Sequence, residues 1–447
     1  MKYYLAIDIG ASSGRHIIGY QNEKNELITE EIYRFPNFLD DINGHLCWNV
    51  ERLFNEIKFG IKQALLKYLN IQSVAIDTWG VDYVLMNENV EIFPVYAYRD
   101  GRTEESIKLV HNIIPFEKLY EITGSQFQTF NTIYQLYKDK IDGRLENATD
   151  FLMIPEYLAY KLTGNKVKEH TNASTTGLCS LKTSTYSSEI IEKLNLNPKL
   201  FNKTYKPGTF VGNFTKDIQK ELGGNIPVIL CCTHDTGSAV EGIKMEQNAP
   251  YISSGTWSLL GIKHKDGINS KEAFEANYSN EYGPDYVRLQ KNIMGLWIIQ
   301  NLSKEMNLGF AEMVNLSKKS NFCTIFDVND KVFLSTSSMK DEIINWYKNR
   351  NLDYPKSNED LINCTYHSLA YSYKVALDEL EKITKEKYSS LYIVGGGAKN
   401  QYLNELTEKY TNRKVIALPI EATAIGNLYI QMEADKWEKK QSINIKN

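Results

Sequence analysis

The sequence predicts an α/β protein made of two similar domains that face each other across a central cleft. Three observations support this prediction. The chain has 447 residues, which is enough for two or three domains with sizeable cores. Runs typical of β-strands alternate with segments of helical periodicity. A strand, a turn of small residues and a second strand occupy residues 3–20 and recur at 251–262, so we expect domains at residues 1–243 and 249–435.

In the first of these hairpins, the turn Gly10–Gly14 joins two β-type runs, and Asp8 precedes it. Glycines permit backbone angles that other residues resist, so the turn can aim several N–H groups at one point. Ser12 and Ser13 add hydroxyl donors. This arrangement suits a phosphate chain, and Asp8 could hold a Mg²⁺ ion on the same phosphates. A turn of small polar residues is also common without any ligand.

Three familiar motifs are excluded. Residues 10–14 fit the G-x-S-x-G pattern of a hydrolase nucleophile, but that motif needs a helix where His16–Tyr20 is strand-like. The glycines at 395–397 follow a strand, yet Asn400 stands where a dinucleotide-binding fingerprint needs its third small residue. No G-x-x-x-x-G-K-[ST] sequence occurs, so the chain has no P-loop.

The rest of the first half continues the alternation. Apolar residues at helical spacing predict a helix within Trp48–Tyr68, with Asn49 as its N-cap. An apolar strand leads into the polar segment Asp77–Asp82, and polar groups beyond a strand end often line a ligand crevice. We expect a helix at 151–162 and a polar loop at 171–176.

Asp235 lies between an apolar strand, Pro227–Cys232, and a segment of small residues that would allow a helix to start. A carboxylate in that position can be a helix cap. It can also serve as a general base that takes the proton from a substrate hydroxyl. The residues alone leave both roles open.

In the second half, a buried helix is expected at 291–302 and a long amphipathic helix at 364–383. The strand at 391–394 ends at the glycines 395–397, where the lack of side chains would let a flat adenine lie against the backbone. We expect Asn400 to cap the helix that follows.

Composition limits the partners. The net charge is −4, from 51 basic and 55 acidic residues, and a nucleic-acid or membrane-surface partner would favour a basic excess. The six cysteines form no C-x-x-C pair, which disfavours a zinc site or a disulfide framework and fits a reducing compartment. Asp8 interrupts the first apolar run, which is untypical of a signal peptide, and no stretch is apolar enough to span a membrane. We therefore expect a soluble cytoplasmic protein; its oligomeric state is left open.

Six segments, in this order, resemble the FGGY carbohydrate kinases, which share the fold of actin, hexokinase and Hsp70. They are DIGASSGR, DTWGVD, YRDGRT, THDTGSA, ISSGTWS and VGGGAKN. The resemblance covers residues 1 to about 435. Within the family, HLCW, YAYRDGRT, SSGTWSLLG and KNIMGLW are most similar to the branch that acts on L-rhamnulose.

The resemblance implies two actin-like, ribonuclease H-like ATPase domains, the first on the sugar side and the second on the nucleotide side. It implies transfer of the ATP γ-phosphoryl group to the 1-hydroxyl of L-rhamnulose, with Mg²⁺, in L-rhamnose catabolism. Sugar and ATP would be the partners. One alternative is a related ketose kinase for L-fuculose or xylulose. The other is an actin-like ATP-binding protein without catalysis.

The resemblance also implies roles for individual residues. Asp235 matches the catalytic base. The sugar contacts would be Gly80, His234, Thr236 and Asn292, beside Asp235 itself. The ATP contacts would be Ala11, Ser12, Ser13, Gly14, Arg15, Thr256, Gln300 and Gly397. Asp8 is expected to hold the metal because of its place before the first turn.

Overall fold

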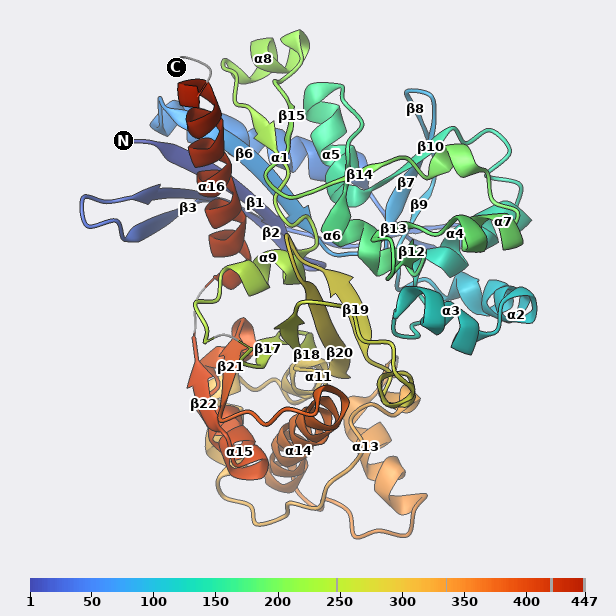
Figure 1. Cartoon of the computed structure of the whole chain (residues 1–447). Helices are drawn as coiled ribbons and strands as arrows, with labels where there is room; N and C mark the ends of the chain where they lie inside the picture. The colour runs from blue at the N-terminus through green and yellow to red at the C-terminus, as the bar shows by residue number, and fades with distance from the viewer. Residues whose placement is uncertain (247, 335, 419–420, 445–447) are drawn as a thin grey trace.

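The computed structural model describes residues 1–246, 248–334, 336–418 and 421–444, with side chains described as far as residue 436 in the last helix. Its framework is a pair of six-stranded sheets, one in each half of the chain (Figure 1). The expected α/β class with one sheet in each half is therefore confirmed.

The first sheet has the strand order β15-β16-β6-β1-β2-β3. Its strands are β1 (Tyr3–Ile9), β2 (Ser13–Gln21), β3 (Leu27–Pro36), β6 (Ile71–Thr78), β15 (Phe210–Gly212) and β16 (Val228–Ile229). The second sheet has the order β19-β20-β18-β17-β21-β22. Its strands are β17 (Tyr251–Ser254), β18 (Trp257–His264), β19 (Ser279–Tyr282), β20 (Val287–Met294), β21 (Ser390–Val394) and β22 (Lys414–Ala417).

The two sheets share one pairing pattern. In the first, β3, β2 and β1 pair antiparallel, and β1 then pairs parallel with β6 and β6 with β16. In the second, β20, β18 and β17 pair antiparallel, and β17 then pairs parallel with β21 and β21 with β22. The hairpins that recur in the sequence, β1–β2 and β17–β18, hold equivalent places in this pattern.

Helices and short strands complete each half. Those of the first half are β4 (Asp40–Ile42), β5 (His45–Trp48), α1 (Val50–Lys67), β7 (Tyr83–Asn87), β8 (Val90–Ile92), β9 (Val95–Tyr96), α2 (Glu104–Ile113), α3 (Phe116–Thr123), α4 (Thr132–Ile141), β10 (Asp150–Met153), α5 (Ile154–Thr163), β11 (Lys168–Glu169), α6 (His170–Ala173), β12 (Cys179–Ser180), β13 (Thr185–Tyr186), α7 (Ser188–Lys193), β14 (Thr204–Tyr205), α8 (Lys216–Leu222) and α9 (Asp235–Glu241). The second half adds α10 (Lys271–Glu275), α11 (Trp297–Met306), α12 (Phe310–Ser317), α13 (Met339–Lys348), α14 (Asn358–Thr384), α15 (Gln401–Thr411) and α16 (Ala422–Asn444).

Helix α1 packs on the first sheet as its periodicity predicts. The Asn49 side chain accepts a hydrogen bond from the Arg52 backbone N–H at 3.0 Å, which caps the helix. Leu53, Ile57 and Ile61 are buried in the same cluster as the inward residues of β1. The expected helix and its cap are both confirmed.

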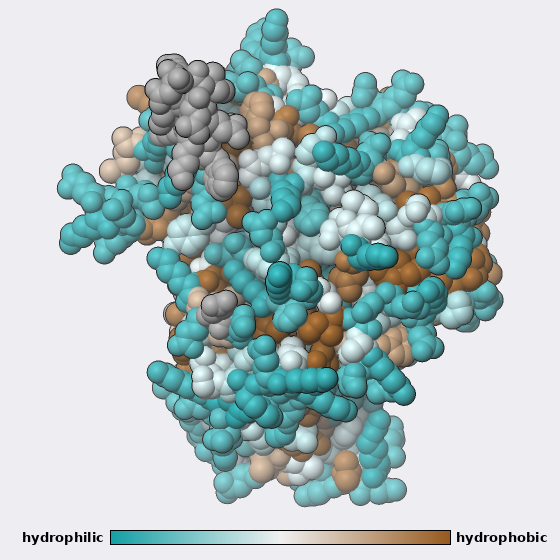
Figure 2. All heavy atoms as spheres, in the orientation of Figure 1, coloured by the Kyte–Doolittle hydropathy of each residue, from teal (hydrophilic) through white to brown (hydrophobic). Residues whose placement is uncertain are grey.

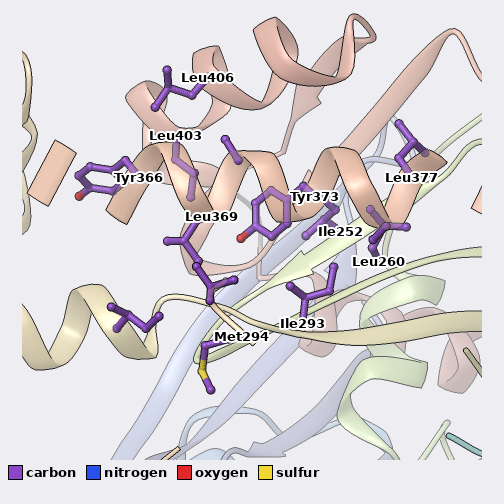
Figure 3. Packing of buried hydrophobic residues seen from close by; sticks show 14 of the residues in the cluster. Ile252, Leu260, Ile293, Met294, Tyr366, Leu369, Tyr373, Leu377, Leu403 and Leu406 are labelled. Atoms are coloured by element: carbon purple, nitrogen blue, oxygen red, sulfur yellow. The ribbon is translucent and has the colours of Figure 1, made fainter. Parts of the chain in front are cut away.

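Helix α14 is the centre of the second core. Tyr366, Leu369, Tyr373 and Leu377 of this helix are buried in one cluster with Ile252, Leu260, Ile293 and Met294 of the sheet, and α15 lies beside the helix (Figure 3). The Tyr373 hydroxyl is hydrogen bonded to Ser258 Oγ at 2.7 Å, so the helix is tied to the sheet by a polar contact as well. The predicted amphipathic helix is confirmed and is longer than expected.

The last helix, α16, returns to the sheet of the first half (Figure 1). Leu428 and Met432 are buried in one cluster with Tyr4 and Ile17 of that sheet. Gln431 Nε2 donates to the Leu5 carbonyl at 3.0 Å. The end of the chain therefore covers part of its beginning.

Three expectations about local structure are wrong. Residues 151–153 belong to β10, and the helix begins only at Ile154. Residues 291–294 belong to β20, and the helix begins at Trp297. Residues 171–176 are buried in α6 and a 3₁₀ turn, where the Glu169 carboxylate accepts from the Thr171 and Asn172 N–H groups. The conformation of these segments depends on how they are buried in the shared core. Periodicity could not predict it, because it does not distinguish short apolar strands from helices.

Hydrophilic side chains cover most of the face drawn in Figure 2, and hydrophobic ones gather where its upper and lower parts meet. Within the described residues, no helix has the length and apolar character that a membrane crossing requires.

Candidate functional site

A cavity of about 290 Å³ lies between the two halves. Residues of both sheets and of the loops beyond them line it, so neither half forms it alone. The first half contributes Ala11, Trp79, Gly80, Val81, Tyr98, Arg99, Ser125, Gln126, Gln128, Phe130, Asn131, Thr175, His234, Asp235 and Thr236. The second half contributes Ser253, Gly255, Thr256, Trp257, Leu259, Ser279, Glu281, Asn292 and Thr423.

The turns of the two equivalent hairpins both reach this cavity. Each is closed by one backbone bond, from Gly10 N to the Ser13 carbonyl at 2.9 Å and from Gly255 N to the Trp257 carbonyl at 2.8 Å. The backbone N–H groups of Ala11 and Thr256 donate to no acceptor among the described residues. Unpaired N–H groups on two turns that face one cavity are suited to an anion such as a phosphate chain.

Close packing holds the second turn against the glycines after β21. A Cβ placed on Gly397 would lie 2.0 Å from Ser254 Oγ, so only glycine fits there. Ser254 Oγ itself is buried and finds no hydrogen-bond partner in the described part of the chain. Buried hydroxyls in a protein core are normally hydrogen bonded, so an unpaired one beside glycine backbone is more typical of a binding site.

Asp235 stands at the start of α9, just beyond the parallel bridge between Thr78 and His234. Its side chain is 31% exposed and faces the cavity. One oxygen accepts from the Thr236 N–H at 2.6 Å. Burial raises the pKa of this carboxyl, and the nearby Asp8 charge acts in the same direction, against the opposing effect of His234. The carboxylate can therefore accept a proton from a group in the cavity.

His234 is held by residues of the second half. Its Nδ1 lies 2.9 Å from Glu281 Oε2, which also accepts from Arg288 Nη2 at 2.9 Å. On the other side of the ring, Nε2 lies 3.5 Å from Asp235 Oδ1. The contact with Glu281 of the second half therefore orients the His234 ring, which lines the cavity.

The loop between β6 and β7 forms one wall and is fixed by a buried carboxylate. Asp82 Oδ2 accepts from Trp48 Nε1 at 2.6 Å and from Trp79 Nε1 at 2.9 Å. Burial raises the Asp82 pKa to about 6 despite these bonds. Val81 has φ +68°, a strained conformation for a β-branched residue, and a Cβ on Gly80 would lie 2.9 Å from Thr175 Oγ1. Such strain is typical of ligand-binding walls.

Carboxylates gather behind the first turn. Asp8 Oδ2 accepts from Arg15 Nε at 2.9 Å and from Arg15 Nη2 at 2.7 Å, and Arg15 also contacts Glu421. Asp77 is fully buried; burial and the Asp8 charge raise its pKa well above the usual range. Asp77 Oδ1 has no partner among the described residues. Among the described residues, there is no group of three or more His, Cys, Asp or Glu side chains that could hold a metal ion.

Comparison with known families matches this chain over nearly its whole length. The profile of the FGGY family of carbohydrate kinases, N-terminal domain, matches residues 3–242, and that of its C-terminal domain matches residues 250–434. The chain belongs to the FGGY family of carbohydrate kinases.

Several relatives of this FGGY kinase are closely similar in sequence. A rhamnulokinase of Oceanobacillus iheyensis is 44% identical over 437 residues, covering 96% of this chain and 93% of the relative. A rhamnulokinase of Halalkalibacterium halodurans is 42% identical over 440 residues, covering 97% and 94%. Among solved structures, gluconate kinase of Lactobacillus acidophilus has a TM-score of 0.80 at 14% identity, covering 98% of this chain and 90% of its own. Glycerol kinase of Plasmodium falciparum with ADP has a TM-score of 0.76 at 15% identity, covering 98% and 90%. These two structures bear on the fold alone.

The FGGY kinase brings seven of the expected site residues together in the cavity wall: Ala11, Gly80, His234, Asp235, Thr236, Thr256 and Asn292. The other expected residues lie around it. Ser12 is exposed beside Ala11, Ser13 opens β2, and Gly14 packs on Phe35. Arg15 pairs with Asp8 behind the turn, Gln300 lies on α11, and Gly397 lies under Ser254.

Sequence reasoning missed four residues that shape the FGGY kinase cavity. Thr175 and Tyr98 line it, and Gln126 lines it while its Oε1 accepts from the Asn292 N–H at 3.2 Å. Glu281 reaches it from β19. Tyr98 lay in the segment YRDGRT, and Thr175 lay in residues 171–176, which were expected to be a polar loop and not part of a binding site. Gln126 and Glu281 carry no local signal, because their partners are far away along the chain.

Proposed function

We propose that this chain is a rhamnulokinase, which transfers the γ-phosphoryl group of ATP to the 1-hydroxyl of L-rhamnulose. The products are L-rhamnulose 1-phosphate and ADP, in L-rhamnose catabolism. The observation that carries the reaction type is the cavity in which Asp235 and His234 face the two phosphate-type turns. The identity of the sugar rests on the relatives that are 37–44% identical over nearly the whole chain.

In the proposed reaction, the carboxylate of Asp235 accepts the proton of the sugar 1-hydroxyl while that oxygen attacks the γ-phosphorus of ATP. The bond between the γ-phosphorus and the bridging oxygen breaks, and ADP leaves with the electron pair. Burial raises the pKa of Asp235, which brings the base nearer to neutral pH and strengthens it. His234, Thr236, Gly80 and Asn292 line the same cavity and would orient the sugar.

The nucleotide would lie on the two turns. The N–H groups and hydroxyls of Ala11–Gly14 and Thr256 would hold the phosphates, with Arg15 behind the first turn. Gly397 and Gln300 would lie toward the adenosine. Ala11 and Thr256 line the cavity, and their unpaired N–H groups fit a ligand with many acceptor oxygens.

The donor set also fits a hard divalent cation. Asp8 offers a carboxylate oxygen, because both of its hydrogen bonds from Arg15 are to Oδ2, and Mg²⁺ commonly takes only one or two carboxylates together with phosphate oxygens and water. We assign Asp8 as the residue that would hold Mg²⁺. When bound, the ion would neutralise charge on the phosphate chain.

A cytoplasmic location is part of the proposal. All six cysteines are free thiols, and five of them are buried. Proteins of oxidising compartments commonly pair their cysteines, so this pattern agrees with a reducing one.

A coupled ADP-release assay across L-rhamnulose, L-fuculose, L-xylulose and D-xylulose tests the proposal. L-rhamnulose should give the highest kcat/KM. Asp235→Asn should lower kcat by about 10²–10⁴-fold because the general base is lost, while ATP binding by calorimetry persists. Asp217→Asn, an exposed carboxylate on α8, is the matched control and should remain active.

Each failure has a distinct meaning. A higher kcat/KM on another ketose would transfer the assignment to that sugar. ATP binding with no ADP release on any sugar would favour a non-catalytic actin-like protein. Near-normal turnover by Asp235→Asn would remove that residue from the base role.

A further inference from the structure

Glu281 is the one acidic side chain of the second half in the described cavity wall. It lies on β19, the edge strand of the second sheet, which packs against α6 of the first half (Figure 1). Its side chain is 10% exposed. A buried carboxylate at the meeting of two halves needs partners, and it has two.

The partners are a histidine and an arginine. Glu281 Oε2 lies 2.9 Å from His234 Nδ1 and 2.9 Å from Arg288 Nη2. Arg288 is wholly buried on β20. Burial alone would favour the neutral acid, but the His234 and Arg288 contacts prevail and lower the Glu281 pKa to about 2. Glu281 is therefore a carboxylate at neutral pH.

This contact decides which ring nitrogen of His234 carries the proton. An ionised carboxylate only accepts hydrogen bonds, so the proton in the 2.9 Å contact between His234 and Glu281 must belong to Nδ1. Arg288 Nη2 can only donate; it lies 3.5 Å from the same Nδ1 but 2.9 Å from Glu281, so its hydrogen bond goes to the carboxylate. In the neutral ring, Nε2 is then the acceptor. Nε2 is also the nitrogen on the side of Asp235, at 3.5 Å from its Oδ1.

We propose that Glu281 is a positioning residue that fixes His234 as the Nδ1–H tautomer, so that Nε2 accepts a hydrogen bond from a hydroxyl of the bound sugar beside Asp235. The inference deepens the proposed function and rests on it. Glu281 belongs to the second half and His234 to the first. The contact between His234 and Glu281 therefore completes the sugar site across the two halves of the chain. We expect this contact to be lost when the halves separate.

The tautomer can be read directly in the full chain without substrate. ¹⁵N-histidine NMR should show the His234 signals of an Nδ1–H ring, assigned by their loss in His234→Gln. A wild-type ring protonated at Nε2 would overturn the proposal, and this measurement does not depend on whether any variant folds. It also separates the two proposals, because an inactive wild-type protein would contradict only the sugar kinase assignment.

Kinetics of Glu281→Gln provide the second test. The neutral amide can donate to Nδ1, so the other tautomer becomes populated, and kcat/KM for L-rhamnulose should fall about 10–100-fold. KM for ATP should stay within twofold. Glu379→Gln is the matched control, because it removes another carboxylate paired with β20, at 2.7 Å from Lys291, away from the cavity wall.

A double-mutant cycle then decides whether Glu281 acts through the histidine. In the His234→Gln background, Glu281→Gln should cost little further activity. Equal losses in both backgrounds would overturn the proposal, as would wild-type kinetics in the single variant.

Discussion

His16 lies wholly inside the first half, under α1, where its imidazole stays neutral. A Cβ placed on Gly60 would lie 2.4 Å from the ring, so the helix backbone packs directly on it. Nε2 is 3.3 Å from the Ile57 carbonyl, and Nδ1 has no partner among the described residues. Burial lowers the His16 pKa from about 6.5 to about 3, and the Ile57 contact opposes this only in part.

A pH dependence of stability follows. Between pH 6.5 and 3 the unfolded chain binds a proton at His16 that the folded chain does not, so stability is lost as the pH falls below 6.5. The loss approaches about 1.4 kcal/mol per pH unit from this residue. Urea unfolding from pH 7.5 to 5 should show a shallower decline for His16→Leu. His264→Leu, which changes a partly exposed histidine, is the control. Equal slopes in His16→Leu and the wild type would contradict the argument.

At the level of single residues, the sequence predicted what local patterns encode. Asp235 and His234 follow an apolar strand and precede small residues, which marks the end of a strand and the start of a helix. Thr175 and Glu281 could not be predicted, because each acts on a residue far away in the sequence. Glu281 reaches His234 only after β19 has paired in the second sheet.

Among the elements, the hairpin turns were predictable and the boundaries of buried runs were not. The turns predicted at 10–14 and 253–256 stand out because small residues interrupt two β-type runs. The structure makes both turns shorter, since Ser13 and Gly14 belong to β2 and Ser253 and Ser254 to β17. Residues 291–294 are the end of β20, although the apolar residues Ile293 and Met294 are followed after only two residues by α11. A short apolar run fits a strand or a helix equally well, so only its pairing with β18 distinguishes it from a helix.

Helices α9 and α16 cross at two glycines. A Cβ on Gly426 would lie 1.8 Å from the Ser238 carbonyl oxygen, and a Cβ on Gly242 would lie 2.1 Å from the Ala422 carbonyl oxygen. Both obstacles are backbone atoms, which cannot rotate away. The crossing therefore fixes α9, the helix that begins at Asp235, against the last helix of the chain.

Gly426→Ala should push the two helices apart. Overpacking of this kind commonly costs about 1–3 kcal/mol, and the shift of α9 should also lower kcat by misplacing Asp235. Thermal unfolding and the ADP-release assay measure the two effects. Gly309→Ala is the control, because a Cβ there meets nothing within 4 Å. A Gly426→Ala protein with wild-type stability and turnover would show that the crossing tolerates a methyl group.

For the whole molecule, the two halves of the sequence depend on each other. Helix α16 covers the face of the first sheet that carries Tyr4, Ala6 and Ile17. It also supplies Asn427, whose Nδ2 donates to the buried Asp77 Oδ2 at 2.6 Å. On the opposite side, β19 is held by the first half through a bond from the Asn280 N–H to the Gly124 carbonyl at 2.9 Å.

A fragment of residues 1–243 should therefore fail to fold alone. Without α16 it exposes an apolar sheet face and leaves Asp77 buried without its amide partner, and both effects favour aggregation. Joining residues 421–447 to the fragment through a glycine–serine linker should restore a monomer that unfolds cooperatively. Size-exclusion chromatography and near-UV circular dichroism distinguish the two proteins.

Leu428→Asp in the joined fragment is the matched control, because a charge placed against Tyr4 and Ile17 should abolish the rescue. Cooperative unfolding of residues 1–243 alone would show that the first half is an independent domain and that α16 is only attached to it. If the rescue depends on Leu428, the packing of α16 on the first half is what holds α9, and with it Asp235, in place. Asp235, the proposed general base, would then reach its place only after the last helix has been made.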